Sequence, residues 1–77
     1  MADSKKAIYS EEHKHLVRKL KKAREEAGLD QNAAAKRLGR SQSYISKIES
    51  GQRRVDLVQL KEFARIYKKN ISYFIPQ

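Results

Sequence analysis

The stretch QNAAAKRLGRSQSYISKIE, from Gln31 to Glu49, decides the fold. It predicts a short helix, a tight turn at Gly39 and a second helix from Gln42. At about 100° per residue, the second helix divides into two faces. One face can pack against a core and carries Tyr44, Ile45, Ile48 and Glu49. The other is a stripe of short hydrogen-bonding side chains with one cation: Gln42, Ser43, Ser46 and Lys47. This stripe has the chemistry of an element that contacts base edges in the DNA major groove.

The spacing of residues in and around this stretch resembles the phage-repressor/Cro-like helix-turn-helix family. The matching residues are Arg24, Gln31, Ala35, Gly39, Ser41, Ile45, Ile48, Glu49 and Gly51, and the segment YISKIESG is much like the family's signature. The resemblance covers Leu16 to Ile75, so it is more specific than a short motif. It implies an all-α, compact, five-helix, lambda-repressor-like domain that binds double-stranded DNA.

Length and composition narrow the function classes. Seventy-seven residues allow one domain with one small core. No run of residues is apolar enough for a membrane span, and the N-terminus MADSKKAIYS lacks the apolar segment of a signal peptide. The absence of cysteine excludes disulfides and thiolate metal sites. We therefore expect a cytoplasmic protein, associated with the nucleoid when bound to DNA, with no membrane partner, metal or cofactor.

The net charge of +9 favours a polyanionic partner. A basic surface can also serve only solubility, so the position of the charge matters. Between Gln31 and Val55 the only acid is Glu49, whereas the bases are Lys36, Arg37, Arg40, Lys47, Arg53 and Arg54. The charge is concentrated at the motif, which supports DNA binding.

Capping residues divide the rest of the chain into helices. The composition of residues 1–9 predicts a disordered tail, whose lysines could reach along a DNA groove. Residues 10–77 are expected to form the domain. Ser10 and Asp30 are N-caps of the first two helices, Ser41 of the third, and Asp56 of the fourth. Gln59 gives Asp56 a capping-box spacing, Asn70 is expected to close the fourth helix, and Ser72 to start a final turn.

Apolar spacing predicts which faces are buried. Ala34, Ala35 and Leu38 should face inward from the second helix. The fourth helix should bury Leu57, Leu60, Phe63, Ala64 and Tyr67. The family usually has a larger aliphatic residue at the place of Ala34, and Tyr44 is a candidate to fill that volume. His13 and His15 diverge around their helix, so they cannot hold one metal and are expected at the surface.

The resemblance assigns DNA contacts to individual residues. Gln42 matches a base-contacting Gln, whose amide can pair with adenine N6 and N7. Gln31 matches a Gln that contacts a phosphate and orders its neighbour. Ser43, Ser46 and Lys47 are further candidates for base contacts, although this stripe alone could be an ordinary polar helix face. The expected phosphate contacts are Gln31, Arg40, Ser41, Tyr44, Arg53 and Arg54, of which Arg40 and Tyr44 are the weaker candidates.

Two further groups are expected to be structural. In the family, a carboxylate at the place of Glu49 pairs with an arginine at the place of Arg24, and this salt bridge fixes the angle of the recognition helix. Near the C-terminus, four apolar residues, Ile71, Tyr73, Phe74 and Ile75, lie within seven positions. Some complete the core and the surplus is expected to form a dimer interface; the alternative is that all four are core.

The leading hypothesis is a sequence-specific transcriptional regulator, a repressor that binds a palindromic operator as a homodimer. Phage repressors, restriction-modification controllers and antitoxins with a toxin partner all share this pattern, and the residues do not separate them. The second hypothesis is a protein-interaction adaptor or coactivator-type module with weak DNA specificity. An enzyme is not expected, because the sequence has no phosphate-binding glycine loop and no evident nucleophile paired with a base.

Overall fold

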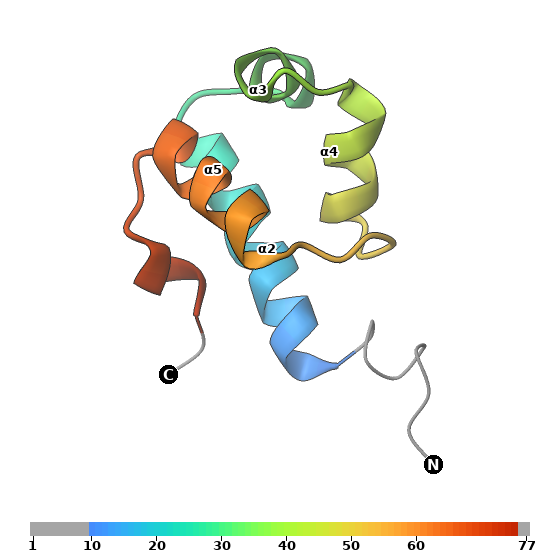
Figure 1. The fold of residues 1–77 in the computed structure, drawn as a ribbon, viewed down its shortest axis with the longest axis vertical. Coiled ribbons are helices and arrows are strands. Elements are labelled where there is room, and N and C mark those ends of the chain that lie inside the picture. Colours follow the sequence, from blue (N-terminus) through green and yellow to red (C-terminus); the bar gives the residue numbers. More distant parts are fainter. Residues whose placement is uncertain (1–9, 76–77) are drawn as a thin grey trace.

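The computed structural model describes residues 10–75, which form four α-helices and one 3-10 turn. The elements, labelled as in Figure 1, are α2 (Glu11–Glu26), α3 (Gln31–Leu38), α4 (Gln42–Glu49), α5 (Leu57–Tyr67) and η1 (Ile71–Phe74). The all-α fold with a helix-turn-helix is confirmed. The fifth predicted helix is a single 3-10 turn. The tail predicted at residues 1–9 lies outside the described residues, as do residues 76–77.

Each α-helix begins at the predicted N-cap. The side chains of Ser10, Asp30, Ser41 and Asp56 each accept a hydrogen bond from the backbone N–H three residues later. Asp56 and Gln59 complete the capping box, with both reciprocal bonds between 2.8 and 2.9 Å. These bonds satisfy backbone donors that a helix start leaves unpaired, which is why short polar residues fix the helix boundaries.

Gly39 makes the tight turn between α3 and α4. Its φ of 70° lies in the left-handed region, which a residue with a Cβ adopts at a cost. The backbone N–H of the next residue, Arg40, then donates to the Ala35 carbonyl at 2.9 Å and closes the end of α3. The chain can therefore reach the N-cap Ser41 within two residues of Gly39.

The core joins all the elements. Leu20 and Ala23 come from α2, Ala34 and Ala35 from α3, and Phe74 from η1; α4 adds Tyr44, Ile45 and Ile48, and α5 adds Leu60, Phe63, Ala64, Ile66 and Tyr67. The ring of Phe63 lies 6.3 Å from that of Tyr44 and 5.6 Å from that of Tyr67. Tyr44 is thus a core residue, although its specific role beside Ala34 stays a prediction.

The helix-turn-helix forms one end of the described domain. In Figure 1, α3 lies across the top and α4 descends along the right-hand edge, while α2 and α5 fill the middle. The contacts agree, because α3 packs on α4 and α5, and α4 packs on α2. One side of α4 is therefore held by the core and the other is left at the edge of the molecule. Within residues 10–75, no helix has the length and hydropathy needed to cross a bilayer.

The end of α5 differs from the prediction. Lys68, rather than Asn70, adopts the left-handed conformation, with φ of 58°, and its N–H closes the last turn. Asn70 has φ of −72° and is the N-cap of η1, where its side chain accepts from the Ser72 N–H at 3.0 Å. The amide oxygen of Asn70 is thus used to begin the next turn, which starts at Ile71 and not at Ser72.

The apolar prediction for α5 was wrong at its first residue. Leu57 is 60% exposed, although it follows the same helical spacing as the buried Leu60 and Ala64. Its neighbour Val58 is 67% exposed. Leu60, in the same first turn of α5, is buried, so the described elements cover only one side of this turn. Helical spacing cannot indicate where that cover ends.

Lys68 provides a test of the helix end. Replacing Lys68 with Gly removes a Cβ from the left-handed region and should raise the free energy of unfolding by about 0.5–1 kcal/mol. Thermal melts should show a rise in Tm of roughly 4–8 °C per kcal/mol for a domain of this size. Asn70→Gly is the matched control and should lower Tm, because it removes the cap of η1. Equal shifts in the two variants would contradict this assignment.

Candidate nucleic-acid interface

The two faces of α4 lie where the sequence predicts them. Tyr44, Ile45 and Ile48 are buried, whereas Gln42 and Lys47 are exposed. Ser43 is also exposed and Ser46 is half-buried, so the predicted base-contacting stripe faces away from the core. A helix held along one side by isoleucines presents its other side as a fixed surface, which direct contact with base edges requires.

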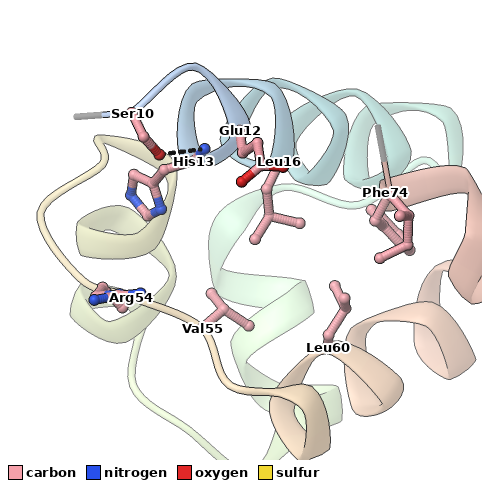
Figure 2. A pocket seen from close by; sticks show the side chains of 9 residues that line it. Ser10, Glu12, His13, Leu16, Arg54, Val55, Leu60 and Phe74 are labelled. Atoms are coloured by element: carbon pink, nitrogen blue, oxygen red, sulfur yellow. Dashed lines mark hydrogen bonds between the residues drawn. The ribbon is translucent and has the colours of Figure 1, made fainter. Parts of the chain in front are cut away.

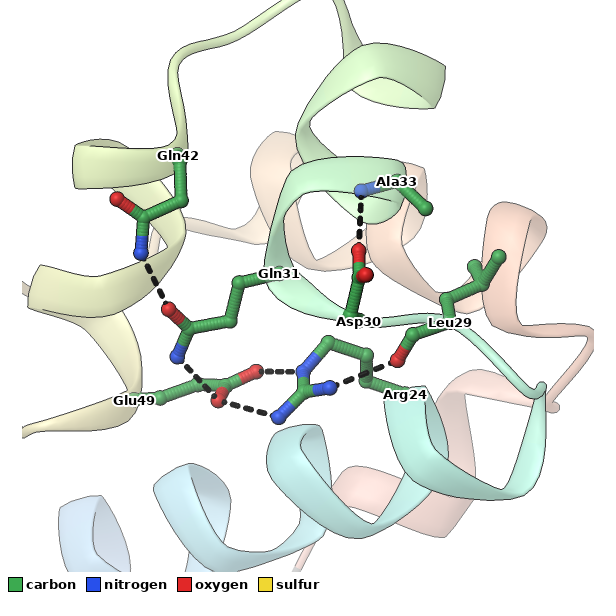
Figure 3. Close-up of polar contacts among 7 residues, drawn as sticks. All are labelled: Arg24, Leu29, Asp30, Gln31, Ala33, Gln42 and Glu49. Atoms are coloured by element: carbon green, nitrogen blue, oxygen red, sulfur yellow. Dashed lines mark hydrogen bonds and ion pairs between the residues drawn. The ribbon is translucent and has the colours of Figure 1, made fainter.

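A nearly buried ion pair ties the end of α4 to α2. Arg24 Nε donates to Glu49 Oε2 at 2.7 Å, and an Arg24 terminal N–H donates to Glu49 Oε1 at 3.1 Å. The two side chains are only 10% and 6% exposed. Arg24 also donates to the Leu29 carbonyl at 2.7 Å, which anchors the guanidinium to the loop between α2 and α3. The geometry expected from the resemblance is present (Figure 3).

The pairing with Glu49 favours the charged form of Arg24. The hydrogen bond to Glu49 raises the pKa of Arg24 above its ordinary value, which opposes the effect of burial. Beside the pair, burial and then the charge of Glu49 raise the pKa of Tyr67 well above the usual value for a phenol. Tyr67 therefore stays neutral beside the ion pair.

Two glutamines continue this network to the surface. Gln31, the first residue of α3, donates through Nε2 to Glu49 Oε1 at 3.1 Å. Gln42, the first residue of α4, donates through Nε2 to Gln31 Oε1 at 2.5 Å. Figure 3 shows the resulting row of hydrogen bonds from Leu29 to Gln42. The structure thus brings Gln31 and Gln42 together, as the ordering role expected for Gln31 requires.

Arginines from both flanks of α4 gather at one aromatic ring. The guanidinium carbon of Arg40, from the turn before α4, lies 4.8 Å from the centroid of the Tyr44 ring. That of Arg53, from the loop after α4, lies 5.0 Å from the same centroid. Both arginines are exposed, as is Arg54. The ring orients two cations by cation–π attraction, while their N–H groups stay available for an anion.

Tyr44 is largely buried, and its expected phosphate contact stays a prediction. It is only 7% exposed, and burial raises the pKa of its hydroxyl despite the opposing charges of Arg40 and Arg53. The predicted contact was inferred from the hydroxyl, whereas the ring is core and supports the two arginines. Ser41 was also expected to contact a phosphate, and it is exposed. Its hydroxyl oxygen accepts the N-cap hydrogen bond from the Tyr44 N–H at 3.2 Å.

His13 makes a contact with Gly51 that the sequence did not predict. Both His13 and His15 are half-buried, so neither is a fully exposed surface residue. The Nε2 atom of His13 lies 3.3 Å from the carbonyl oxygen of Gly51, where the chain leaves α4. Sequence separation of 38 residues hides such a contact, because only the packing of α2 against the loop brings the two together.

This loop borders a shallow hollow of about 330 Å³. Figure 2 shows His13 and Leu16 on the α2 side, Arg54 and Val55 on the loop, and Phe74 at the end of η1. Val55 is half-buried and packs against the core, whereas its neighbour Arg54 is exposed. The loop is therefore held at Val55, and the basic side chains that precede Val55 project from a fixed base.

The residues predicted for a dimer interface divide between core and surface. Phe74 is 1% exposed and belongs to the core, so its assignment to a dimer surface is corrected. Ile71 and Tyr73 are half-buried and pack against the core. Ile75 is 46% exposed. Composition could not separate these residues, because a 3-10 turn with three residues per turn directs consecutive side chains to different sides.

A scan against protein-family models matches residues 15–68 to a helix-turn-helix domain family. The chain belongs to this family, which is part of the Cro-like group. The matched segment contains α3, α4 and every residue of the network in Figure 3. A search of curated proteins gave no match. Family membership and the exposed stripe on α4 together identify DNA as the partner of this domain.

The ion pair yields a direct test. In Glu49→Ala, Arg24 would remain nearly buried without its partner, so the free energy of unfolding should fall by about 3–5 kcal/mol. DNA binding should also be lost, because α4 loses the tie that fixes its angle. Urea unfolding and a DNA-binding titration measure the two effects.

The matched control is Glu26→Ala. Glu26 pairs with Lys69 at 2.6 Å, but its side chain is 45% exposed, so its removal should change stability little. If Glu49→Ala kept both the Tm and the DNA affinity of the unmodified protein, α4 would not depend on the pair.

Proposed function

We propose that this protein is a sequence-specific transcriptional regulator that acts as a repressor, binding a palindromic operator as a homodimer through α4. The observation that carries the proposal is the stripe of polar side chains on α4, which lies opposite its buried isoleucines. Gln42 is the N-terminal residue of this stripe. The N-terminal part of a recognition helix is the part that contacts base edges. A protein that only tethered other proteins would have no need for this arrangement.

The positive charges around α4 suggest that some residues provide affinity for DNA and others provide sequence specificity. Arg40, Arg53 and Arg54 flank α4, which would place them along the sugar-phosphate backbone when α4 enters the groove. Contacts of this kind set the position of a protein on DNA without distinguishing sequences. Sequence would then be recognised by Gln42, Ser43, Ser46 and Lys47, with Gln42 the most selective because its amide has both a donor and an acceptor.

The exposed apolar residues support a second copy as partner. Leu57, Val58 and Ile75 are the large apolar residues that residues 10–75 leave exposed. Exposed apolar surface is typical of protein interfaces when it is contiguous. In a two-fold dimer, the two copies of α4 would contact half-sites about 34 Å apart, one turn of DNA. Repression would follow from occupation of a promoter by such a dimer.

Selection from a randomised duplex library at about 150 mM salt tests the proposal, because non-specific phosphate binding is already weak there. We expect a palindromic consensus with half-sites about one turn apart. Gln42→Ala should relax one position in each half-site and cost about 1–3 kcal/mol, whereas Arg54→Ala should weaken all sequences alike and reduce the salt slope by about 1. No enrichment would favour the adaptor or antitoxin alternative.

A second experiment tests the dimer. Val58→Gln replaces an exposed apolar side chain by a neutral polar one, so it should shift sedimentation towards the monomer and weaken binding to a full palindrome more than to a half-site. Lys61→Gln, at an exposed position of the same helix, is the control for general changes in α5. Sedimentation of the unmodified protein as a monomer, both free and on its DNA, would contradict the homodimer.

A further inference from the structure

Every hydrogen bond in the row from Leu29 to Gln42 has a fixed direction. Arg24 has only donors, and it donates to the Leu29 carbonyl and to both oxygens of Glu49. An ionised carboxylate has only acceptors, so any amide that contacts Glu49 must present its N–H. Gln31 does so, with its Nε2 at 3.1 Å from Glu49 Oε1.

The orientation of Gln31 determines that of Gln42. With Gln31 Nε2 turned to Glu49, the carbonyl oxygen of the Gln31 amide faces Gln42. That oxygen accepts from Gln42 Nε2 at 2.5 Å. The Gln42 amide therefore keeps its own oxygen and one N–H for another partner. Alone on an exposed helix end, this amide would turn between its two orientations at little cost, and the row of bonds removes that freedom.

We propose that Glu49, acting through Gln31, sets the direction of the Gln42 amide and thereby determines which base Gln42 recognises. This inference rests on the proposed function, because it concerns the same DNA contact. With its oxygen outward and one N–H beside it, Gln42 presents an acceptor and a donor, which match adenine N6–H and N7. With the amide reversed, two N–H donors would point outward and match the two acceptors of guanine, N7 and O6.

The burial of Glu49 makes it suited to this positioning role. Its side chain is only 6% exposed, and both of its oxygens are already engaged by Arg24. Reversal of the Gln31 amide would place its carbonyl oxygen against a carboxylate with little water to separate them, and would lose the hydrogen bond. The ion pair thus fixes the angle of α4 and also controls, from the core, the chemistry that Gln42 presents to DNA.

Glu49→Gln tests the proposal by changing one oxygen to an N–H donor. The new amide has one oxygen, which can take either the position of Oε1, where Arg24 and Gln31 both donate, or that of Oε2, where Arg24 alone donates. Residue 49 then no longer requires an N–H from Gln31, so neither direction of the Gln42 amide is fixed. We expect the preference for adenine over guanine at the Gln42 position to fall by about 10-fold.

Glu49→Gln also breaks an ion pair and could unfold the domain, so Gln31→Lys is the second variant. The ammonium of lysine has only donors, and it can donate both to Glu49 and to the oxygen of Gln42. It should therefore reverse Gln42, and change the preferred base from adenine to guanine, while Arg24 and Glu49 stay paired. Gln31→Met has similar length and no hydrogen-bonding capacity comparable to an amide, so it should relax the base preference without reversing it.

The readout is the ratio of affinities for duplexes that differ only in the base pair whose contribution Gln42→Ala abolishes. A looser helix lowers both affinities, whereas a reversed amide changes their order. In the double variant Gln31→Lys with Gln42→Ala, the change of preference should disappear, which excludes direct recognition by the new lysine. Retention of the adenine preference in a folded Gln31→Lys variant would overturn the proposal.

A measurement without DNA separates this proposal from the function on which it rests. In nitrogen–proton correlation spectra of the free protein, the bonded amide proton of Gln42 should be shifted downfield, and the shift should vanish in Gln31→Met. A Gln42 amide indifferent to residue 31 would overturn the relay of hydrogen bonds. A relay present in the spectra, together with no sequence selected from the library, would instead contradict the proposed function.

Discussion

The rest of the structure depends on the pairing of Arg24 with Glu49. Burial of the Glu49 carboxylate on the core side of α4 would cost free energy if it had no partner. The Arg24 guanidinium of α2 offsets this cost only when the two helices are placed so that the side chains meet. Because α4 has eight residues, its packed face is short, and the isoleucines alone leave freedom to tilt. We expect that non-directional apolar contacts fix the depth of α4 and that the directional ion pair fixes its angle. The net stabilisation from such a pair is small, and its main effect is to penalise the alternatives.

Local interactions account for most of what the sequence predicts correctly. The four N-caps, the left-handed glycine at the turn and the two faces of α4 all depend on residues within four positions of one another. Such features are visible in a sequence because backbone geometry alone connects their members. The pairing of Arg24 with Glu49 spans 25 residues, and it was expected only because the chain resembles a known family. Nothing in the spacing of a lone arginine and a lone glutamate indicates that they meet.

The errors arise where tertiary contacts override local pattern. Leu57 has the spacing of a core residue and is exposed, because the described elements cover only the side of this turn that carries Leu60. Asn70 has a high propensity for the left-handed conformation, yet Lys68 adopts it, because the last hydrogen bonds of α5 are made two residues earlier. His13 meets Gly51 across the fold, and Phe74 completes the core instead of the surface. The conformational preference of a single residue contributes about 1 kcal/mol or less to the free energy of folding. The packing of side chains across the fold readily contributes more.

The same distinction separates the two kinds of DNA contact that we propose for this domain. Arg40 and Arg53 reach the ring of Tyr44 from opposite flanks of α4, and a cation needs only approximate placement to attract a phosphate. An amide must also point in the correct direction, because its two ends differ in hydrogen-bonding character while its shape is almost symmetric. Shape alone therefore cannot orient Gln42, and a neighbour with an unambiguous preference is needed. An ionised carboxylate has such a preference, and the core is where its charge acts most strongly on its neighbours. The near-symmetry of the amide thus explains why Gln42, at the start of α4, would need a link through Gln31 to the buried charge at the end of the same helix.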